Sequence, residues 1–163
     1  MSDARFQDAA PRGPDTPLRL LAQDAGDIPA LSALAQDAVF TGADATFFAP
    51  RRRFALLLTR FRWEDRAAAE ATGRPYERVK SLLVIDNVTA LRSNGYDAGD
   101  KSAVRVLLAL AFAAKDDLGG TLTLPLAAGG GAIAMDLETI DITLRDVTRP
   151  HRAVVQAVPD HGP

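Results

Sequence analysis

Alternating apolar and polar residues recur along the chain, and this period of two indicates half-buried β-strands. In the longest run, FALLLTRFRW at residues 54–63, Arg60 and Arg62 share one face of the predicted strand while Phe61 and Trp63 share the other. Shorter runs bounded by Gly, Asn and Asp predict further strands over residues 18–22, 78–85, 88–93, 121–127 and 132–137.

Turn residues join these strands into two series. Asp86 and Asn87 tolerate a positive φ, so they predict a hairpin turn between the strands on either side. The glycines at 129–131 predict the corresponding turn in the second series. Pro125 cannot donate a ladder hydrogen bond, so its strand is expected at a sheet edge or with a bulge. The similarity of the two series fits an old duplication, and it fits the ordinary recurrence of hairpins equally.

Helical spacing is clearest just after the first predicted strand. Asp27 is a candidate N-cap, and Pro29 follows in the first turn, where its missing N–H costs little. The apolar positions with a helical period are Ile28, Leu31, Leu34, Ala35, Ala38 and Val39. Their stripe is narrow, so we expect one face of this helix to pack on a sheet.

Two segments fit either kind of element. Residues 104–114 (VRVLLALAFAA) are apolar except for Arg105 and rich in Ala and Leu, yet we expect a strand because the neighbouring hairpins need a partner. Residues 138–147 have a strand pattern and a helical pattern. Acidic residues near the start of this segment and Arg145 near its end complement a helix dipole, so we expect a helix there.

These elements predict an α+β fold, with a mainly antiparallel sheet of two three-stranded meanders, one early helix and one C-terminal helix. The element order is similar to that of the pleckstrin-homology fold, with a strongly bent sheet or half-open barrel. We expect the folded domain over residues 18–148, after a disordered leader at 1–17 and before a flexible tail at 149–163.

The composition suits one hydrophobic core, because 47% of the 163 residues are hydrophobic and 25% are charged. No apolar run resembles the core of a signal peptide or approaches the roughly 18 residues of a membrane span. We therefore expect a cytoplasmic protein that makes no membrane contact.

The formal net charge of −2 conceals an uneven distribution. Residues 45–92 carry ten Lys or Arg against five Asp or Glu, whereas both flanking parts are acidic. A basic segment inside an acidic chain suits a small anionic ligand or a protein partner, and it argues against bulk nucleic-acid binding.

The densest basic feature is the FALLLTRFRW strand with the arginines before it. If residues 78–85 pair antiparallel with this strand, cations of both strands can form a face for phosphate or carboxylate groups. Trp63 is a candidate anchor for a partner, although a lone Trp at a strand end also suits the edge of a core. The candidate binding residues are Arg53, Arg60, Arg62, Trp63, Arg78 and Lys80. Alternatively, the arginines form ion pairs with Glu64, Asp65 and Glu77.

Catalytic and metal chemistry has few candidates. The chain has no cysteine, and His151 and His161 both lie in the predicted tail. Asp136 and Glu138 can form a carboxylate pair, but they equally suit the start of a helix. The glycines at 129–131 lack the Lys-Ser or Lys-Thr of a phosphate-binding loop. We expect no catalytic residue, no metal site and no cofactor.

Two functions fit these observations. The first is a non-enzymatic binding module that recognises a protein partner or a small anionic ligand through the basic face. A homodimer through a sheet edge belongs to the same class. The second is a small enzyme acting on an anionic metabolite, with Arg60, Arg62 and Arg78 as a clamp and Glu64 or Asp65 as the base. The lack of a credible acid–base set favours the binding module.

Three stretches of the chain resemble a bacterial family of unknown function, domain-of-unknown-function family 2948. They are RRRFALLLTRFRWED, RVKSLLVIDNVTALRSNG and GGTLTLPLAAGGGAIAMDLETIDITLRDV. The resemblance covers roughly residues 18–148 and implies a small single-domain member of the family. It implies no activity and no catalytic residue.

Overall fold

The computed structural model describes residues 16–97 and 99–152 of the chain. Its strands form two sheets, and every strand pairing among the described residues is antiparallel. The strands of the first sheet are β1 (Arg19–Ala22), β2 (Val39–Thr41), β3 (Ala45–Phe48), β4 (Arg53–Phe61), β5 (Glu77–Ile85), β7 (Val104–Val106), β11 (Ile142–Asp146) and β12 (His151–Arg152). Those of the second are β6 (Val88–Asn94), β8 (Ala111–Ala114), β9 (Gly120–Pro125) and β10 (Ala132–Leu137).

The first sheet has the order β1-β11-β5-β4-β2-β7, with β12 beside β5 and β3 beside β4. The second has the order β6-β10-β9-β8. The α-helices are α2 (Ile28–Ala35) and α3 (Arg66–Thr72), and the short 3-10 turns are η1 (Ala25–Asp27), η2 (Gly42–Asp44), η3 (Ala49–Arg51) and η4 (Trp63–Asp65). The sheets do not close into a barrel. The prediction of an α+β fold with a mainly antiparallel sheet is confirmed.

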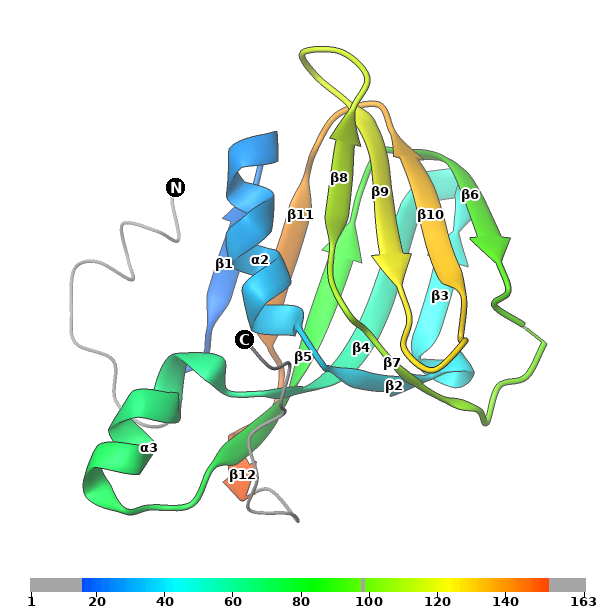
Figure 1. Ribbon diagram of the computed structural model, residues 1–163. Helices are drawn as coiled ribbons and strands as arrows, with labels where there is room; N and C mark the ends of the chain where they lie inside the picture. Colours follow the sequence, from blue (N-terminus) through cyan, green and yellow to red (C-terminus); the bar gives the residue numbers. More distant parts are fainter. Residues whose placement is uncertain (1–15, 98, 153–163) are drawn as a thin grey trace.

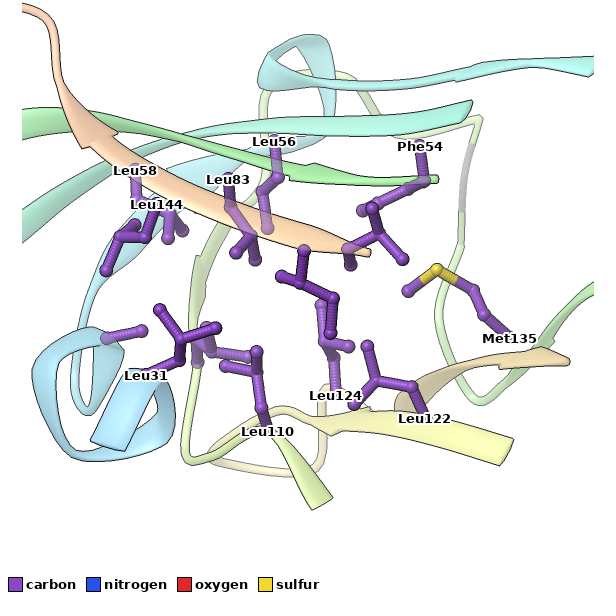
Figure 2. Close-up of a cluster of buried hydrophobic side chains, with 14 of the residues drawn as sticks. Leu31, Phe54, Leu56, Leu58, Leu83, Leu110, Leu122, Leu124, Met135 and Leu144 are labelled. Atoms are coloured by element: carbon purple, nitrogen blue, oxygen red, sulfur yellow. The ribbon is translucent and has the colours of Figure 1, made fainter. Parts of the chain in front are cut away.

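The core lies between the two sheets, and α2 and the second sheet both stand on the same side of the first sheet (Figure 1). Inward residues of the two sheets and of α2 meet in one layer of mostly leucine side chains (Figure 2). Labelled members of this layer are Leu31, Leu56, Leu58, Leu83, Leu122, Leu124, Met135 and Leu144. Along the middle of β4 and β5 inward and outward residues alternate, so Leu83 is fully buried while its neighbour Leu82 is half-buried.

The chain bends from the first sheet into the second at Asp86 and Asn87. Asn87 has a φ of 62°, and its carbonyl accepts a hydrogen bond from the N–H of Glu138 at 3.0 Å. The N–H of Asp86 donates to the carbonyl of Asp141, also at 3.0 Å. Two stretches of chain therefore turn the corner side by side: β5 continues into β6, and β10 continues into β11.

The expectation of a hairpin at Asp86-Asn87, and hence of a first meander, is wrong. β6 pairs with β10 in the second sheet, not with β5. The bend lets both strands turn their apolar side chains to one core, whereas a flat hairpin would leave the second strand beside the first. The β9 and β10 hairpin is confirmed, with glycine φ values of 73° at Gly129 and 80° at Gly131 in its turn.

The predicted C-terminal helix is also wrong, because residues 142–146 form β11. This strand pairs with β1 on one side and β5 on the other, and these ladders pair the backbone groups that a helix would pair internally. Glu138 at the start of the segment pairs with Arg52 across the corner. The second helix of the fold is α3, in the connection between β4 and β5.

The choice of strand for residues 104–114 is confirmed with an interruption. β7 pairs with β2 in the first sheet and β8 pairs with β9 in the second, so this segment also crosses between the sheets. Leu107 and Leu110, which lie in the crossing, are buried in the core. Their burial accounts for the leucines at the centre of the segment.

Pro125 was expected at a sheet edge or at a bulge. Its strand, β9, lies in the interior of the second sheet, and the pairing with the neighbouring segment has a bulge. Leu107 faces Leu126 and Ala111 faces Thr123, so four residue steps on one side oppose three on the other. The N–H of Leu108 donates to the carbonyl of Pro125 at 2.9 Å. The irregular pairing leaves no ladder bond that would require a proline N–H.

The early helix is confirmed with its predicted N-cap, but it ends at Ala35, so the predicted helical positions Ala38 and Val39 lie outside it and Val39 begins β2. Ile28, Leu31 and Ala35 of α2 are buried, as the predicted stripe requires. Asp27 occupies the N-cap position without a side-chain capping bond, and its carboxylate instead accepts a hydrogen bond from the N–H of Gln23 at 3.0 Å.

Of the predicted leader and tail, residues 1–15 and 153–163 lie outside the described residues. His151 and Arg152 pair with β5 as β12.

Neighbouring leucines on β5 test the two faces of the first sheet. Leu83→Ala removes a fully buried side chain, so we expect the free energy of unfolding to fall by about 2–5 kcal/mol. Leu82→Ala truncates a half-buried outward residue and should cost about 1 kcal/mol or less. Urea unfolding followed by circular dichroism measures both, and equal losses would contradict the assignment of faces.

Candidate functional site

The alternation along β4 carries Arg60 into the interior, where its side chain is 0% exposed. Its guanidinium donates to both carboxylate oxygens of Glu64 at 2.8 Å, to Asp146 Oδ1 at 2.9 Å and to Ser81 Oγ at 2.9 Å. Ser81 in turn donates to Asp146 Oδ1 at 2.7 Å, and the N–H of Leu18 donates to the other oxygen at 2.8 Å. We call Arg60, Glu64, Ser81 and Asp146 the Arg60 cluster.

Charge is retained in this cluster in spite of burial. Desolvation acts to lower the pKa of Arg60, but the hydrogen bonds and charges of Glu64 and Asp146 raise that pKa above its ordinary value. Desolvation likewise acts to raise the pKa of Glu64, yet pairing with Arg60 brings it below the ordinary value. The carbonyl of Phe61 accepts the remaining guanidinium hydrogen bond, at 3.3 Å. All five Arg60 donors are thus engaged inside the fold.

Arg62 is held in a second group of charges beside the first. Its side chain is 5% exposed, and its Nη1 lies 2.5 Å from Glu77 Oε1 and 3.6 Å from Asp65 Oδ2. Arg74 donates to both oxygens of Asp65 at 2.5 and 2.7 Å, and this hydrogen bonding lowers the pKa of Asp65. These contacts are the ion pairs expected under the alternative interpretation of the arginines, except that they are buried instead of solvated.

Trp63 and Arg53 also have partners inside the fold. The indole N–H of Trp63 donates to the carbonyl of Gln36 at the end of α2, at 3.1 Å, and its ring packs edge to face on Phe61 at 4.8 Å. Arg53 is exposed and donates to both oxygens of Asp86 at 2.6 and 3.4 Å. Trp63 therefore fastens α2 to the first sheet, and Arg53 stabilises the corner.

The last two predicted residues, Arg78 and Lys80, lie on the opposite side of the first sheet. β5 pairs antiparallel with β4 as required, so Lys80 faces Thr59 and Arg78 faces Phe61. Lys80 is exposed, and Arg78 stacks over the Phe61 ring with 5.8 Å between the guanidinium carbon and the ring centroid. The structure therefore separates the six predicted residues instead of gathering them on one face.

Arg78 and Lys80 belong to a larger surface, which we call the outer face. It consists of outward residues of β1, β2, β4, β5, β7 and β11, on the side of the first sheet away from the core. Its cations are Arg19, Arg53, Arg78, Lys80 and Arg145, and its half-buried aliphatic residues are Leu21, Val39, Leu57, Leu82, Val84 and Val106. Leu57 and Leu82 are direct cross-strand partners at its centre.

Sequence reasoning missed Arg19 and Arg145. The two are cross-strand partners, and Arg145 faces Leu82 on its other side. Only the pairing of β1 with β11 and of β11 with β5 brings them beside Lys80, and residues 138–147 had been expected as a helix. The available signal was the alternation of Ile142 and Leu144, which leaves Arg145 on the opposite face.

The candidate carboxylate pair does not form. Asp136 accepts both Arg92 hydrogen bonds, at 2.6 and 2.9 Å, while Glu138 pairs with Arg52 at 3.2 Å. No group of three His, Cys, Asp or Glu side chains among the described residues could hold a metal ion. In the same part of the chain, no helix is long and apolar enough to cross a membrane.

Three cavities lined by described residues lie away from the Arg60 cluster. The largest, about 350 Å³, lies between Lys115, Asp136 and Glu138, and a small one of about 110 Å³ adjoins it near Asp116. The third, about 230 Å³, opens between β3 and β6. None of the three is lined by Arg60, Arg62 or Arg78.

Comparison with known proteins identifies the family. The sequence model described as a protein of unknown function (DUF2948) matches residues 18–161. The chain belongs to the DUF2948 family. The match includes all of the strands and continues past the last described residue. No curated protein and no solved structure matches the chain.

Removing Arg60 from this DUF2948 protein should leave two carboxylates without their cation. We expect Arg60→Ala to lower the free energy of unfolding by about 3–5 kcal/mol. The matched control is Arg52→Ala, whose pair with Glu138 is exposed, and it should cost about 1 kcal/mol or less. Urea unfolding distinguishes them, and a small effect of Arg60→Ala would contradict the structural role of the cluster.

The Arg60 cluster also predicts a pH dependence. The pKa of Glu64 in the folded state is below its ordinary value of 4.5, so its stabilising contribution is complete above pH 4.5 and is lost as the pH falls through the lowered pKa. The difference in unfolding free energy between the wild type and Glu64→Gln should therefore narrow as the pH falls below 4.5. Urea titrations at several pH values measure it, and a constant difference is the opposing result.

Proposed function

We propose that this DUF2948 protein is a cytoplasmic, non-enzymatic interaction module that binds an acidic protein partner on its outer face. The composition of that face supports the proposal. Among the described strands β1 to β5, β7 and β11, the outward positions carry aliphatic residues, threonines, the exposed Phe48, the buried Phe61 and cations, with no Asp or Glu. The nearest carboxylate, Asp86 just after β5, pairs with Arg53. Such a bias is notable in a chain whose net charge is −2.

The apolar part of the outer face is contiguous across the sheet. Leu57 and Leu82 pair directly, Val84 lies two residues further along β5, and Val39 pairs with Val106 at the far side. None of these side chains reaches the burial of the inward row. Contiguous apolar surface with a polar rim is typical of protein interaction sites.

Apart from Arg53, which pairs with Asp86 at the opposite end, the cations of the outer face gather at one end. Arg19 and Arg145 are direct cross-strand partners, and like charges in that position repel each other. The side chains of Lys80 and Arg145 make no hydrogen bond or ion pair within residues 16–97 and 99–152. A partner with carboxylates at this end would gain charge-assisted hydrogen bonds from Lys80 and Arg145.

Other occupants of the outer face are less well supported. Its centre is aliphatic and Phe48 lies at the rim, so bases of a nucleic acid would find no aromatic platform. A second copy stacked face to face would bring the two sets of cations together. A homodimer through a sheet edge stays a separate prediction, for which β6 offers a seven-residue edge strand.

The enzymatic alternative is less well supported, because most of its proposed catalytic side chains are engaged in contacts inside the fold. Arg60 and Arg62 are buried in ion pairs, and the pKa values of Glu64 and Asp65 are lowered, which makes both carboxylates weaker bases. The interaction module needs no rearrangement of these groups.

Two designed helical peptides with identical leucine positions, one otherwise rich in Glu and the other in Lys, test the preference for acidic partners. We expect only the Glu peptide to bind, with an affinity that falls as salt is added. Lys80→Glu should weaken this binding by about fivefold or more, and the double variant Lys80→Glu/Arg145→Glu should weaken it further. Fluorescence anisotropy measures each affinity.

The matched control is Lys115→Glu, which makes the same charge change on an exposed residue outside the outer face. The affinity of the Lys115→Glu variant for the Glu peptide should stay close to that of the wild type. Equal binding of both peptides, or equal losses for Lys80→Glu and Lys115→Glu, would show that the outer face is not the binding surface.

A further inference from the structure

The two sheets are open along the side where β3 and β6 face each other, and a cleft of about 230 Å³ occupies this opening. Phe54 and Ile133, which are 3% and 2% exposed, form its floor and belong to the core. Phe47 of β3 and Leu91 of β6 stand on opposite sides, and Tyr96 follows from the loop after β6. The cleft therefore continues the apolar interior to the surface.

Leu91 shows why the cleft exists. It pairs with Met135, a fully buried residue of β10, so its side chain points to the inner side of the second sheet. Leu91 is nevertheless 37% exposed, because β6 is an edge strand and no described strand covers this side. An inward apolar position thus faces open space, which a ligand can fill.

Aromatic side chains are concentrated in the cleft. Phe47, Phe54 and Tyr96 line it, although the whole chain has only seven Phe, two Tyr and one Trp. Arg105 lies 4.5 Å from the Tyr96 ring centroid and donates to the carbonyl of Asp97 at 3.1 Å, which holds this ring at the rim. Such walls favour a planar aromatic ring, which can make edge and face contacts with them.

The charged residues that line the cleft, Arg92 and Lys101, are both cations. Arg92 is held by Asp136 through two hydrogen bonds, at 2.6 and 2.9 Å. Lys101 is exposed, and its ammonium makes no hydrogen bond or ion pair with the described residues. An anionic group on a ligand in the cleft would therefore meet Lys101, with Ser93 as a further hydrogen-bonding partner.

We propose that this cleft is a binding site for a small aromatic carboxylate, whose ring lies among Phe47, Leu91 and Tyr96 and whose carboxylate pairs with Lys101. The site is on the inner side of the sandwich and is independent of the outer face. It shares no residue with the Arg60 cluster. Either binding surface can exist without the other, so the tests of the two are separate.

The probe is 2-naphthoate, with neutral 2-naphthylmethanol as its matched analogue. We expect 2-naphthoate to bind and to shift amide NMR signals of residues in β3 and β6, and we expect the alcohol to bind about tenfold more weakly. Lys101→Gln should remove most of the difference between the two compounds. Leu91→Trp should fill the cleft and abolish the binding of both.

Matched variants outside the cleft control for charge and for added aromatic surface. Lys115→Gln removes an exposed cation elsewhere, and Leu118→Trp adds an aromatic ring at a side chain that is already 66% exposed. Both should bind 2-naphthoate as the wild type does, and circular dichroism verifies that every variant is folded. The proposal is overturned if 2-naphthoate does not bind, if Leu91→Trp binds it normally, or if the alcohol binds equally well.

Discussion

The buried guanidinium of Arg60 is the constraint on which the assembly of the first sheet depends. Its five donors require oxygen atoms from Glu64 just after β4, Ser81 on β5 and Asp146 on β11, together with a local carbonyl. A buried cation without these partners would cost several kcal/mol, so the strands must meet in one register. The carboxylate of Asp146 extends the constraint to β1, through the N–H of Leu18.

The corner between the sheets is the second constraint, and it decides how two flat ladders enclose one core. β5 and β11 pair in the first sheet, β6 and β10 pair in the second, and both stretches bend together near Asn87. The register shift between Asp136 and Leu137 lies at the same bend. Residues 104–114 also cross between the sheets. On the other side of the sandwich β6 is an edge strand, and the opening between β3 and β6 forms the apolar cleft.

Burial also separates the charges of the chain by function. Arg60 on β4 and Arg62 just after it are neutralised inside the fold. The exposed Arg53 and Arg92 are paired with carboxylates of their own. The cations of β1, β5 and β11 point outward beside aliphatic residues. The same basic segment therefore supplies structural ion pairs on one face of the sheet and, on the opposite face, Arg78 and Lys80 of the surface that we propose for a partner.

Periodicity alone was sufficient for most of the strands, the early helix and the α+β class, because alternation and helical spacing are local properties. The missing cysteine and the family resemblance were equally visible in the residues. Alternation also showed that Arg60 and Arg62 share a face. It did not show that this face turns inward, because the burial of Arg60 depends on β11, whose Asp146 lies more than 80 residues away in the sequence. For the same reason, residues 138–147 became a strand only because β1 and β5 stand on either side of them. The outer face, with Arg19, Lys80 and Arg145 side by side, exists only in the tertiary structure, because its members come from strands that are distant in sequence and adjacent in the sheet.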